Sequence, residues 1–334
     1  MLIISRTPVR ISFFGGGTDY PAYFLREKGA TLGTTIDKYT YVSVNTLSDF
    51  FEHKIRIGYS KTELVKEASE IEHPSIRECL KFKQLSDNLD IHIFSDLPAK
   101  TGLGSSSSFT VGFLNALYAL KGQKIPKQRL AEEACLVEQT LIKENVGSQD
   151  QFHAAYGGFN IFEFFPSHIQ VRPLIISQEK KQILEQSLLI FYTGLTRFAS
   201  DVVKEQLRKT AQKDNDHYLK EMLQMVYRAE EIITSPSIKK EDLVEKFASL
   251  LDQSWQIKKQ LSSKISNFLI DEAYALAKKN GAYGGKLCGA GSGGFLALFV
   301  PPEKQSAVRK ALSHLLEVPF HFENEGSSII YMKE

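Results

Sequence analysis

The stretch LPAKTGLGSSSS, residues 97–108, constrains the fold of this chain more than any other part of its sequence. The strand-like run LDIHIFSD (Leu89 to Asp96) leads into it, and a helical pattern begins at its serines. Gly102 and Gly104 let the backbone wrap closely around a ligand because they carry no Cβ atom. The first N–H groups of a helix lack partners and carry partial positive charge. The stretch therefore predicts a strand, an anion-binding loop and a helix in that order.

The hydroxyls of Ser105 to Ser108 add hydrogen-bond donors and a ligand type that Mg²⁺ accepts. The alternative is an ordinary helix cap with solubilising serines. Four serines exceed what a cap requires, so the pattern favours phosphate. The loop is not a Walker A motif, because Gly-Lys-Ser/Thr is missing. GAYGGKL (residues 281–287) has the wrong spacing and a leucine after Lys286.

The stretch CGAGSGG, residues 288–294, matches the GxGxxG pattern of dinucleotide-binding proteins. That pattern requires a following helix, but here the strand-like run FLALFV (Phe295 to Val300) follows. We therefore reject dinucleotide binding. Two alternatives remain open: a tight hairpin, or a second backbone wall for a phosphate or a substrate.

A helix expected from Pro126 to about Lys143 places one carboxylate on its apolar face. The face consists of Leu130, Ala134, Val137 and Leu141, widened by Ala131, Cys135 and Ile142. Glu138 lies inside it, whereas Arg129, Glu132, Glu133, Lys143 and Glu144 are expected to point elsewhere. A buried carboxylate is costly unless a cation, metal or donor meets it. Glu138 is therefore either half of a core ion pair or a metal ligand.

Two further polar stretches are candidates. In NVGSQDQFHAAYGG (residues 145–158), Asp150 precedes a short helical run, where it could cap the helix or accept a proton from a substrate hydroxyl. In GGGTDY (residues 15–20), three glycines imply a close approach to the backbone, and Asp19 follows them.

The length of 334 residues suits two domains, and we place them at 1–175 and 176–334. Strands in the first half do not alternate regularly with helices, which favours an α+β fold over a doubly wound sheet. The second half is expected to be mainly helical from Ala199 to Asn280, followed by strands and one helix.

The charge balance of 41 basic and 39 acidic residues excludes recruitment of nucleic acid or membrane by charge alone. No run of 18 apolar residues and no signal-peptide pattern is present. Three widely spaced cysteines, Cys79, Cys135 and Cys288, imply neither a disulfide framework nor a metal pair. A reducing cytoplasm is the simplest expectation.

Three motifs together give the chain a resemblance to the GHMP kinases, which include galactokinase, homoserine kinase, mevalonate kinase and phosphomevalonate kinase. They are TPVRISFFGGGTDY (residues 7–20), PAKTGLGSSSS (98–108) and KLCGAGSGG (286–294). The resemblance implies an N-terminal domain like domain 2 of ribosomal protein S5, a ferredoxin-like C-terminal domain, and ATP and Mg²⁺ between them.

The resemblance also implies roles for individual residues. Those expected at ATP are Gly102, Leu103, Gly104, Ser105, Ser106, Ser107, Gly289 and Gly291. Ser106 and Glu138 stand where the family binds its metal ion. Asp150 is similar to the aspartate taken as catalytic base in the sugar and mevalonate branches, and Arg10 matches its neighbouring arginine.

The sugar site is expected at Gly16, Gly17, Thr18 and Asp19, where galactokinases read Glu-His-Thr-Asp. The missing bulky side chains indicate a substrate larger than a hexose, and Asp19 can accept two hydroxyl hydrogen bonds. GGGTD together with TTIDKYTYVSV (Thr34 to Val44) is similar to bacterial heptose kinases. The expected reaction is phosphorylation of D-glycero-D-manno-heptose 7-phosphate at its anomeric hydroxyl, for GDP-heptose and surface polysaccharide synthesis.

The 7-phosphate needs cations, for which Arg197 is the first candidate and Arg172 and Lys38 are weaker ones. Lys100 stands where the family usually carries glycine, so its role is open. Three rivals remain: a GHMP kinase for another sugar such as L-fucose or galactose, a catalytically silent sugar and ATP sensor, and a decarboxylase. The partner is expected to be a small sugar phosphate, and a homodimer is an expectation that the sequence does not decide.

Overall fold

The computed structural model describes residues 1–85, 88–99, 101–195 and 200–333. Among these residues the strands form a nine-stranded and a four-stranded sheet. The larger sheet contains β1 (Leu2–Phe14), β2 (Gly29–Thr46), β3 (Ile55–Gly58), β4 (Thr62–Val65), β5 (Leu89–Ser95), β6 (Asn160–Phe164), β7 (Ile169–Pro173), β12 (Phe322–Glu323) and β13 (Ser328–Lys333). The smaller sheet contains β8 (Leu188–Tyr192), β9 (Gly284–Leu287), β10 (Phe295–Phe299) and β11 (Leu316–Glu317). The expected α+β architecture is confirmed.

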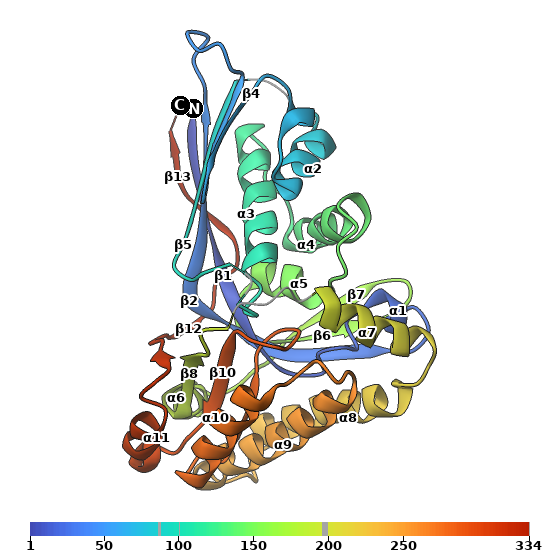
Figure 1. Ribbon diagram of the computed structural model, residues 1–334, viewed down its shortest axis with the longest axis vertical. Coiled ribbons are helices and arrows are strands. Elements are labelled where there is room, and N and C mark those ends of the chain that lie inside the picture. Colours follow the sequence, from blue (N-terminus) through green and yellow to red (C-terminus); the bar gives the residue numbers. More distant parts are fainter. Residues whose placement is uncertain (86–87, 100, 196–199, 334) are drawn as a thin grey trace.

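Helices α2, α3 and α4 pack on one face of the larger sheet (Figure 1). The first half contains α1 (Pro21–Phe24), the 3₁₀ turn η1 (Ala68–Glu70), α2 (Pro74–Lys83), α3 (Ser105–Leu120), α4 (Lys127–Cys135), the π-helix η2 (Leu136–Leu141) and α5 (Gln149–Tyr156). Apolar side chains such as Val42 and Val44 of β2 and Phe113 and Leu117 of α3 share one core cluster. This packing fixes α3, and with it the loop at its start.

The second half forms the helical layer below this sheet in Figure 1. It contains α6 (Gln178–Ser187), α7 (Ser200–Ala211), α8 (Asp216–Thr234), α9 (Lys240–Gln260), α10 (Phe268–Lys279), the 3₁₀ turn η3 (Pro302–Lys304) and α11 (Gln305–Ala311). The ring of Phe247 in α9 packs edge-on against Phe13 and Phe14 of β1, at centroid distances of 5.5 and 5.2 Å. These contacts hold the end of β1 against the second half of the chain.

The expected helix from Pro126 forms, but it changes its winding at residue 136, where α4 passes into the π-helix. A π-turn shifts the phase of the following side chains relative to an α-helix. Leu141, expected on the buried face, is consequently 38% exposed. The expectation that Glu133 points elsewhere is also wrong: it is buried and accepts hydrogen bonds from Tyr118 Oη at 2.6 Å and Arg129 Nε at 2.9 Å.

The chain returns to its first sheet at the end. β13 pairs antiparallel with β1, β12 pairs with β2, and the two termini lie side by side (Figure 1). The division at residue 175 stays a prediction, with these last strands belonging to the sheet of the first part. None of the helices in the described residues combines the length and the apolar composition that a membrane span requires.

Candidate active site

The predicted anion-binding loop joins β5 to α3, and its glycines are required by a second loop that packs against it. Gly104 caps α3 in the left-handed conformation, with φ of +77°. A Cβ on Gly102 would lie 2.4 Å from the carbonyl oxygen of Cys288, and one on Gly294 would lie 2.2 Å from that of Thr101. The loop at 101–104 and the loop at 288–294 are therefore in backbone-to-backbone contact.

The loop at 288–294 connects β9 and β10, which pair antiparallel. A hairpin, one of the two alternatives left open by the sequence, is therefore present, and the strand that follows the loop agrees with the rejection of a dinucleotide fold. Gly289 and Gly291 both have positive φ, at +81° and +122°. Because the hairpin packs directly against the loop at 101–104, its backbone can form a second side of a phosphate or substrate site at that loop. Binding by its glycines remains a proposal.

The serines at the start of α3 face different directions. Ser106 is exposed, whereas Ser105, Ser107 and Ser108 are buried. Ser107 Oγ donates to Glu138 Oε2 at 2.9 Å, and Ser108 Oγ donates to the carbonyl oxygen of Pro8 at 2.7 Å. Ser107 thus contacts the predicted metal-binding carboxylate directly, and Ser106 is the serine open to a ligand.

Glu138 is 1% exposed, which agrees with the expectation of a buried carboxylate. Its Oε2 accepts hydrogen bonds from Ser107 and from Gln151 Nε2, and its Oε1 has no hydrogen-bond partner. Burial raises the pKa of Glu138 to about 7. Within the described residues Glu138 has no lysine or arginine partner in an ion pair, so the core ion pair is not formed.

An unpartnered carboxylate oxygen next to a serine-rich loop fits a hard cation such as Mg²⁺. In the described part of the chain, no group of three or more His, Cys, Asp or Glu side chains could hold a metal ion. A metal at Glu138 would therefore complete its coordination with phosphate oxygens and water, as Mg²⁺ usually does.

Arg10 and Asp150 form a two-pronged ion pair beside the loop. Arg10 Nε donates to Asp150 Oδ1 at 2.8 Å, and Nη2 donates to Oδ2 at 2.7 Å. Arg10 Nη1 donates to the carbonyl oxygen of Gly102 at 2.7 Å. A Cβ on Gly104 would lie 3.3 Å from Asp150 Oδ2 and 3.4 Å from Arg10 Cγ, so the pair lies at the very start of α3.

The glycines of GGGTDY approach protein backbone. A Cβ on Gly15, whose φ is +79°, would lie 1.9 Å from the carbonyl oxygen of Ala30. The hydroxyl of Thr18 donates to the carbonyl oxygen of Gly15 at 2.8 Å and accepts from Ala30 N at 3.0 Å. Thr18 is fully buried. The structure therefore places the Thr18 hydroxyl between the GGGTDY loop and the start of β2, and its expected contact with substrate stays a prediction.

Asp19, by contrast, lies next to the start of α5, the helix that carries Asp150. Its Oδ1 accepts from Gly17 N at 2.8 Å, and its backbone oxygen accepts from Ser148 N at 2.9 Å. Burial raises the pKa of Asp19, and the nearby carboxylate of Asp150 raises it further, while the Gly17 N–H and Lys258 lower it.

Two lysines that the sequence analysis did not single out lie at this site. Lys258 of α9 is 7% exposed and donates to the carbonyl oxygen of Gly16 at 3.1 Å. Lys286 of β9 is 8% exposed and donates to the carbonyl oxygen of Ser12 at 2.8 Å. Burial lowers the pKa of each to about 8. A signal existed for Lys258, because it continues the buried stripe of Leu251 and Trp255 at helical spacing.

Several buried polar atoms around these residues have no hydrogen-bond partner. They are Ser12 Oγ, Glu138 Oε1, Gln149 Oε1, Gln151 Oε1 and Gln206 Nε2. Buried polar groups are normally paired. Their concentration near Asp19 and Asp150 is what a site for a polar ligand requires.

The expected phosphate-binding cations have different outcomes. Arg197 and Lys100 lie outside the described residues. Arg172 donates to both carboxylate oxygens of Glu230, at 2.7 and 2.8 Å, and to Glu163 at 3.2 Å. Its charge is thus used in a structural ion pair, which removes it as a candidate.

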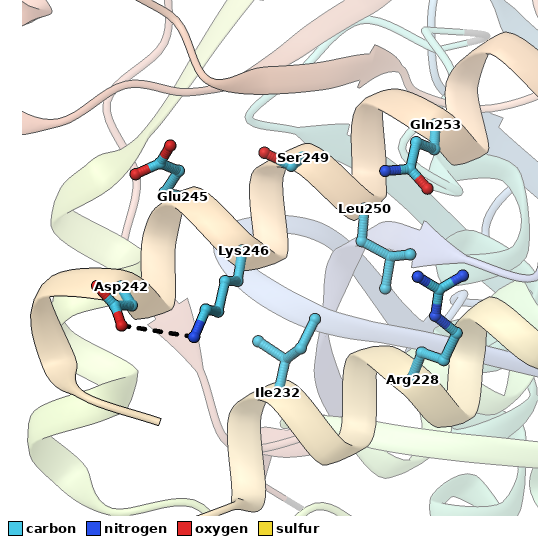
Figure 2. A pocket seen from close by; sticks show the side chains of 8 residues that line it. All are labelled: Arg228, Ile232, Asp242, Glu245, Lys246, Ser249, Leu250 and Gln253. Carbon is cyan, nitrogen blue, oxygen red and sulfur yellow. Dashed lines mark hydrogen bonds and ion pairs between the residues drawn. The ribbon is translucent and has the colours of Figure 1, made fainter. Parts of the chain in front are cut away.

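A groove lies between α8 and α9 (Figure 2). It is lined by Arg228, Ile232, Asp242, Glu245, Lys246, Ser249, Leu250 and Gln253. Its walls carry charges of both signs on two exposed helix surfaces, and Lys246 pairs with Asp242 at 3.4 Å (Figure 2). None of the predicted site residues lines this groove, so we give it no role in the chemistry.

Comparison with known proteins identifies two regions of the chain. Residues 74–158 match the model of the GHMP kinases N terminal domain, and residues 237–317 match that of the GHMP kinases C terminal domain. The chain is 28% identical over 338 residues to D-glycero-alpha-D-manno-heptose 7-phosphate kinase of Campylobacter jejuni, covering 97% of both chains. It is 27% identical to galactokinase of Pyrococcus furiosus, covering 93% of this chain and 92% of that one.

Among solved structures, the chain is similar to a D-glycero-D-manno-heptose 1-phosphate kinase from Bacteroides thetaiotaomicron. The TM-score is 0.78 at 23% identity, and the match covers 99% of this chain and all of that one. At this identity the likeness shows the fold.

Proposed function

From the premise that this chain belongs to the GHMP kinase family and is a sugar kinase, we propose that it phosphorylates D-glycero-D-manno-heptose 7-phosphate. The proposed reaction transfers the γ-phosphoryl group of ATP to the anomeric hydroxyl, giving heptose 1,7-bisphosphate, ADP and a proton. The product would feed the synthesis of GDP-heptose and surface polysaccharide. The observation that carries the proposal is the placement of Arg10 and Asp150 beside the loop at 101–104, with Asp19 against residues 147–149, which directly precede Asp150.

The proposed nucleotide site uses the loop residues Gly102 to Ser107 and the hairpin glycines Gly289 and Gly291. Backbone N–H groups at the start of α3 would bind phosphate oxygens, aided by the helix dipole. Ser106 and Glu138 are the proposed ligands of Mg²⁺. When bound, the metal would neutralise charge on the β- and γ-phosphates.

Asp150 is proposed to receive the proton of the anomeric hydroxyl. Each carboxylate oxygen offers two lone pairs, so a hydroxyl can still bind although Arg10 occupies one position on each oxygen. The guanidinium holds the carboxylate in one orientation. Since it lies between Asp150 and the loop, it can also stabilise the negative charge that develops on the transferred group.

The sugar is proposed to lie against Gly16, Gly17 and Asp19. A Cβ on Gly16 would meet only Gln149 Nε2 at 3.6 Å and Ser12 Oγ at 3.8 Å, so a side chain would fit there. The absence of a side chain at Gly16 leaves room next to Ser12 and Gln149, whose Oγ and Oε1 atoms have no hydrogen-bond partner. This supports a substrate with one more hydroxylated carbon than a hexose. Arg197 remains the proposed partner of the 7-phosphate.

The deciding experiment is an ADP-release assay over a panel of heptose 7-phosphate, unphosphorylated heptose, L-fucose, galactose and mannose. We expect the highest kcat/KM for heptose 7-phosphate. Strong turnover of a neutral hexose without turnover of heptose 7-phosphate would overturn the proposed substrate. A calorimetric titration in which sugar and ATP both bind but no ADP forms would point instead to a catalytically silent sensor.

A further inference from the structure

Lys258 and Asp19 bind opposite ends of one peptide group. Lys258 Nζ donates to the carbonyl oxygen of Gly16 at 3.1 Å, and Asp19 Oδ1 accepts from the N–H of Gly17 at 2.8 Å. The carbonyl of Gly16 and the N–H of Gly17 belong to the same planar peptide unit. Lys258 is 7% and Asp19 1% exposed, so this cation–peptide–carboxylate chain is shielded from water.

The ammonium group of Lys258 is unusual for a structural lysine. Within the described residues it has no carboxylate within salt-bridge distance, and its second acceptor is the neutral Gln206 Oε1 at 3.3 Å. Burying an ammonium group without a hydrogen-bonded carboxylate is costly, and an apolar residue of similar volume often stabilises a protein more. A selected role for the charge is therefore expected, beyond holding the loop.

We propose that Lys258 is a positioning residue for the sugar, which acts through the peptide group between Gly16 and Gly17 to keep Asp19 ionised and oriented towards substrate. This rests on the proposed function, in which Asp19 accepts hydrogen bonds from sugar hydroxyls. A cation on the carbonyl oxygen polarises the peptide and strengthens its N–H as a donor. That donor occupies Oδ1. Among the described residues, the one hydrogen bond to Oδ2 is a long one from Gln149 N at 3.5 Å, and Oδ2 also lies against Gly147, where a Cβ would come within 1.9 Å of it. Oδ2 therefore keeps lone pairs with which it can accept a sugar hydroxyl.

The charges around Asp19 determine the expected pH effect. The groups that face it are Asp150 of α5, Lys258 of α9, Lys286 of β9 and Tyr20 of its own loop. Burial and Asp150 raise the pKa of Asp19, whereas the Gly17 N–H and Lys258 lower it. Removing the charge of Lys258 should raise this pKa further. Less Asp19 is then ionised at a given acidic pH, so sugar affinity should fall first on the acid side.

The test compares Lys258→Met with the wild type in the full-length enzyme, measuring kcat and both KM values between pH 5.5 and 9. At a pH below the pKa of Asp19, a rise of one unit in that pKa lowers the ionised fraction of Asp19 about tenfold. We expect the sugar KM to rise about 10-fold at pH 6 and less than about threefold at pH 9, because the ionised fraction of Asp19 changes only on the acid side. The ATP KM should stay unchanged.

A second variant separates charge from folding. Lys258→Gln retains a donor for the carbonyl oxygen of Gly16 but carries no charge, and it should show the same acid-side rise in sugar KM. The matched control is Lys259→Met, which removes a partly exposed lysine from the next position and should leave the pH profile unchanged. Melting temperatures of all three variants verify that they are folded.

The outcomes separate this inference from the proposed function. If the wild type phosphorylates sugars but neither the Met nor the Gln variant moves the acid side of the sugar KM profile, Lys258 only supports the fold and this inference is wrong. An equal rise in the sugar KM at every pH would also show that this inference is wrong. If the wild type phosphorylates no sugar in the panel, the proposed function itself fails.

Discussion

Arg10 donates one hydrogen bond to each carboxylate oxygen of Asp150 and a third to the carbonyl oxygen of Gly102. A single side chain of β1 therefore joins the start of α5 to the loop before α3. The guanidinium fork suits this task, because it presents several donors in a fixed plane. The proposed proton acceptor, Asp150, is thereby held at a fixed position relative to the proposed phosphate site.

Replacement of Asp150 by Asn should lower kcat by at least about 100-fold, the usual contribution of a positioned acid or base. Affinity for a non-hydrolysable ATP analogue should stay within about threefold, because Asp150 is not among the proposed phosphate donors. Steady-state kinetics and calorimetry measure the two quantities. A variant that retains more than a tenth of the wild-type kcat would remove Asp150 from this role.

The chain contains a matched control for that substitution. Arg56 donates to both carboxylate oxygens of Asp90, at 2.8 and 2.6 Å, in a similar pair on β3 and β5. Asp90→Asn breaks the same kind of ion pair away from the site. We expect it to leave kcat within about twofold of wild type, since no proposed substrate contact is lost.

Replacement of Arg10 by Lys should also be damaging. A lysine keeps the charge but cannot bind both oxygens of Asp150 and the carbonyl of Gly102 in one plane. We expect kcat to fall by about 10- to 100-fold with a smaller change in the ATP KM. The control is Arg26→Lys, because Arg26 likewise binds both oxygens of Asp216 and also donates to backbone carbonyls, those of Ala22 and Thr210. A similar loss of kcat in both variants would contradict a specific role for Arg10.

The sequence was informative where one residue violates a strong pattern. Glu138 stands out as a charge on an apolar helical face, and it is buried with one unpartnered oxygen. Lys258 follows the same logic on α9 and could have been found in this way. What the helical pattern cannot supply is the change from α- to π-winding at residue 136, because that change depends on packing rather than on local spacing.

Glycine positions were harder to interpret. The sequence predicts close approach at Gly15, but not that the approaching group is the backbone of Ala30. It likewise cannot show that Thr18 uses its hydroxyl in this turn. Such contacts join residues that are well separated in the sequence, so they depend on tertiary structure. The resemblance to a kinase family identifies the loop, and only the structure separates its structural residues from those open to a ligand.

Glu138 gives a prediction about pH and metal. Its pKa of about 7 lies above its ordinary value of 4.5, so between these values the folded protein holds a proton that the unfolded chain releases. Stability therefore falls as pH rises through this window. Glu138→Gln removes the effect. Without metal, the melting temperature of the variant minus that of the wild type should therefore be about 5 °C larger at pH 8 than at pH 5.

Addition of Mg²⁺ and ATP at pH 8 should raise the melting temperature of wild type more than that of Glu138→Gln, since binding to the native state stabilises it. Glu133→Gln is the control, because Glu133 is a buried carboxylate in the same helical segment that already has Arg129 and Lys83 as partners. It should respond to Mg²⁺ and ATP like wild type. Parallel pH curves for wild type and Glu138→Gln would contradict the assignment.

The contact between the two glycine loops gives the last prediction. In Gly102→Ala the new Cβ would lie 2.4 Å from the carbonyl oxygen of Cys288, and the residue would also have to adopt a φ of +86°. Gly122 has a similar φ of +66°, but a Cβ added there would have nothing within 4 Å, and it lies at the far end of α3. Gly122→Ala should therefore cost only the strain of a left-handed alanine, about 1–2 kcal/mol.

Gly102→Ala should lower the melting temperature further and raise the ATP KM at least about 10-fold, since a displacement of about one ångström can cost a factor of about 100 in such sites. If both variants lose the same stability and keep the wild-type ATP KM, the loop at 288–294 is not a wall of the nucleotide site.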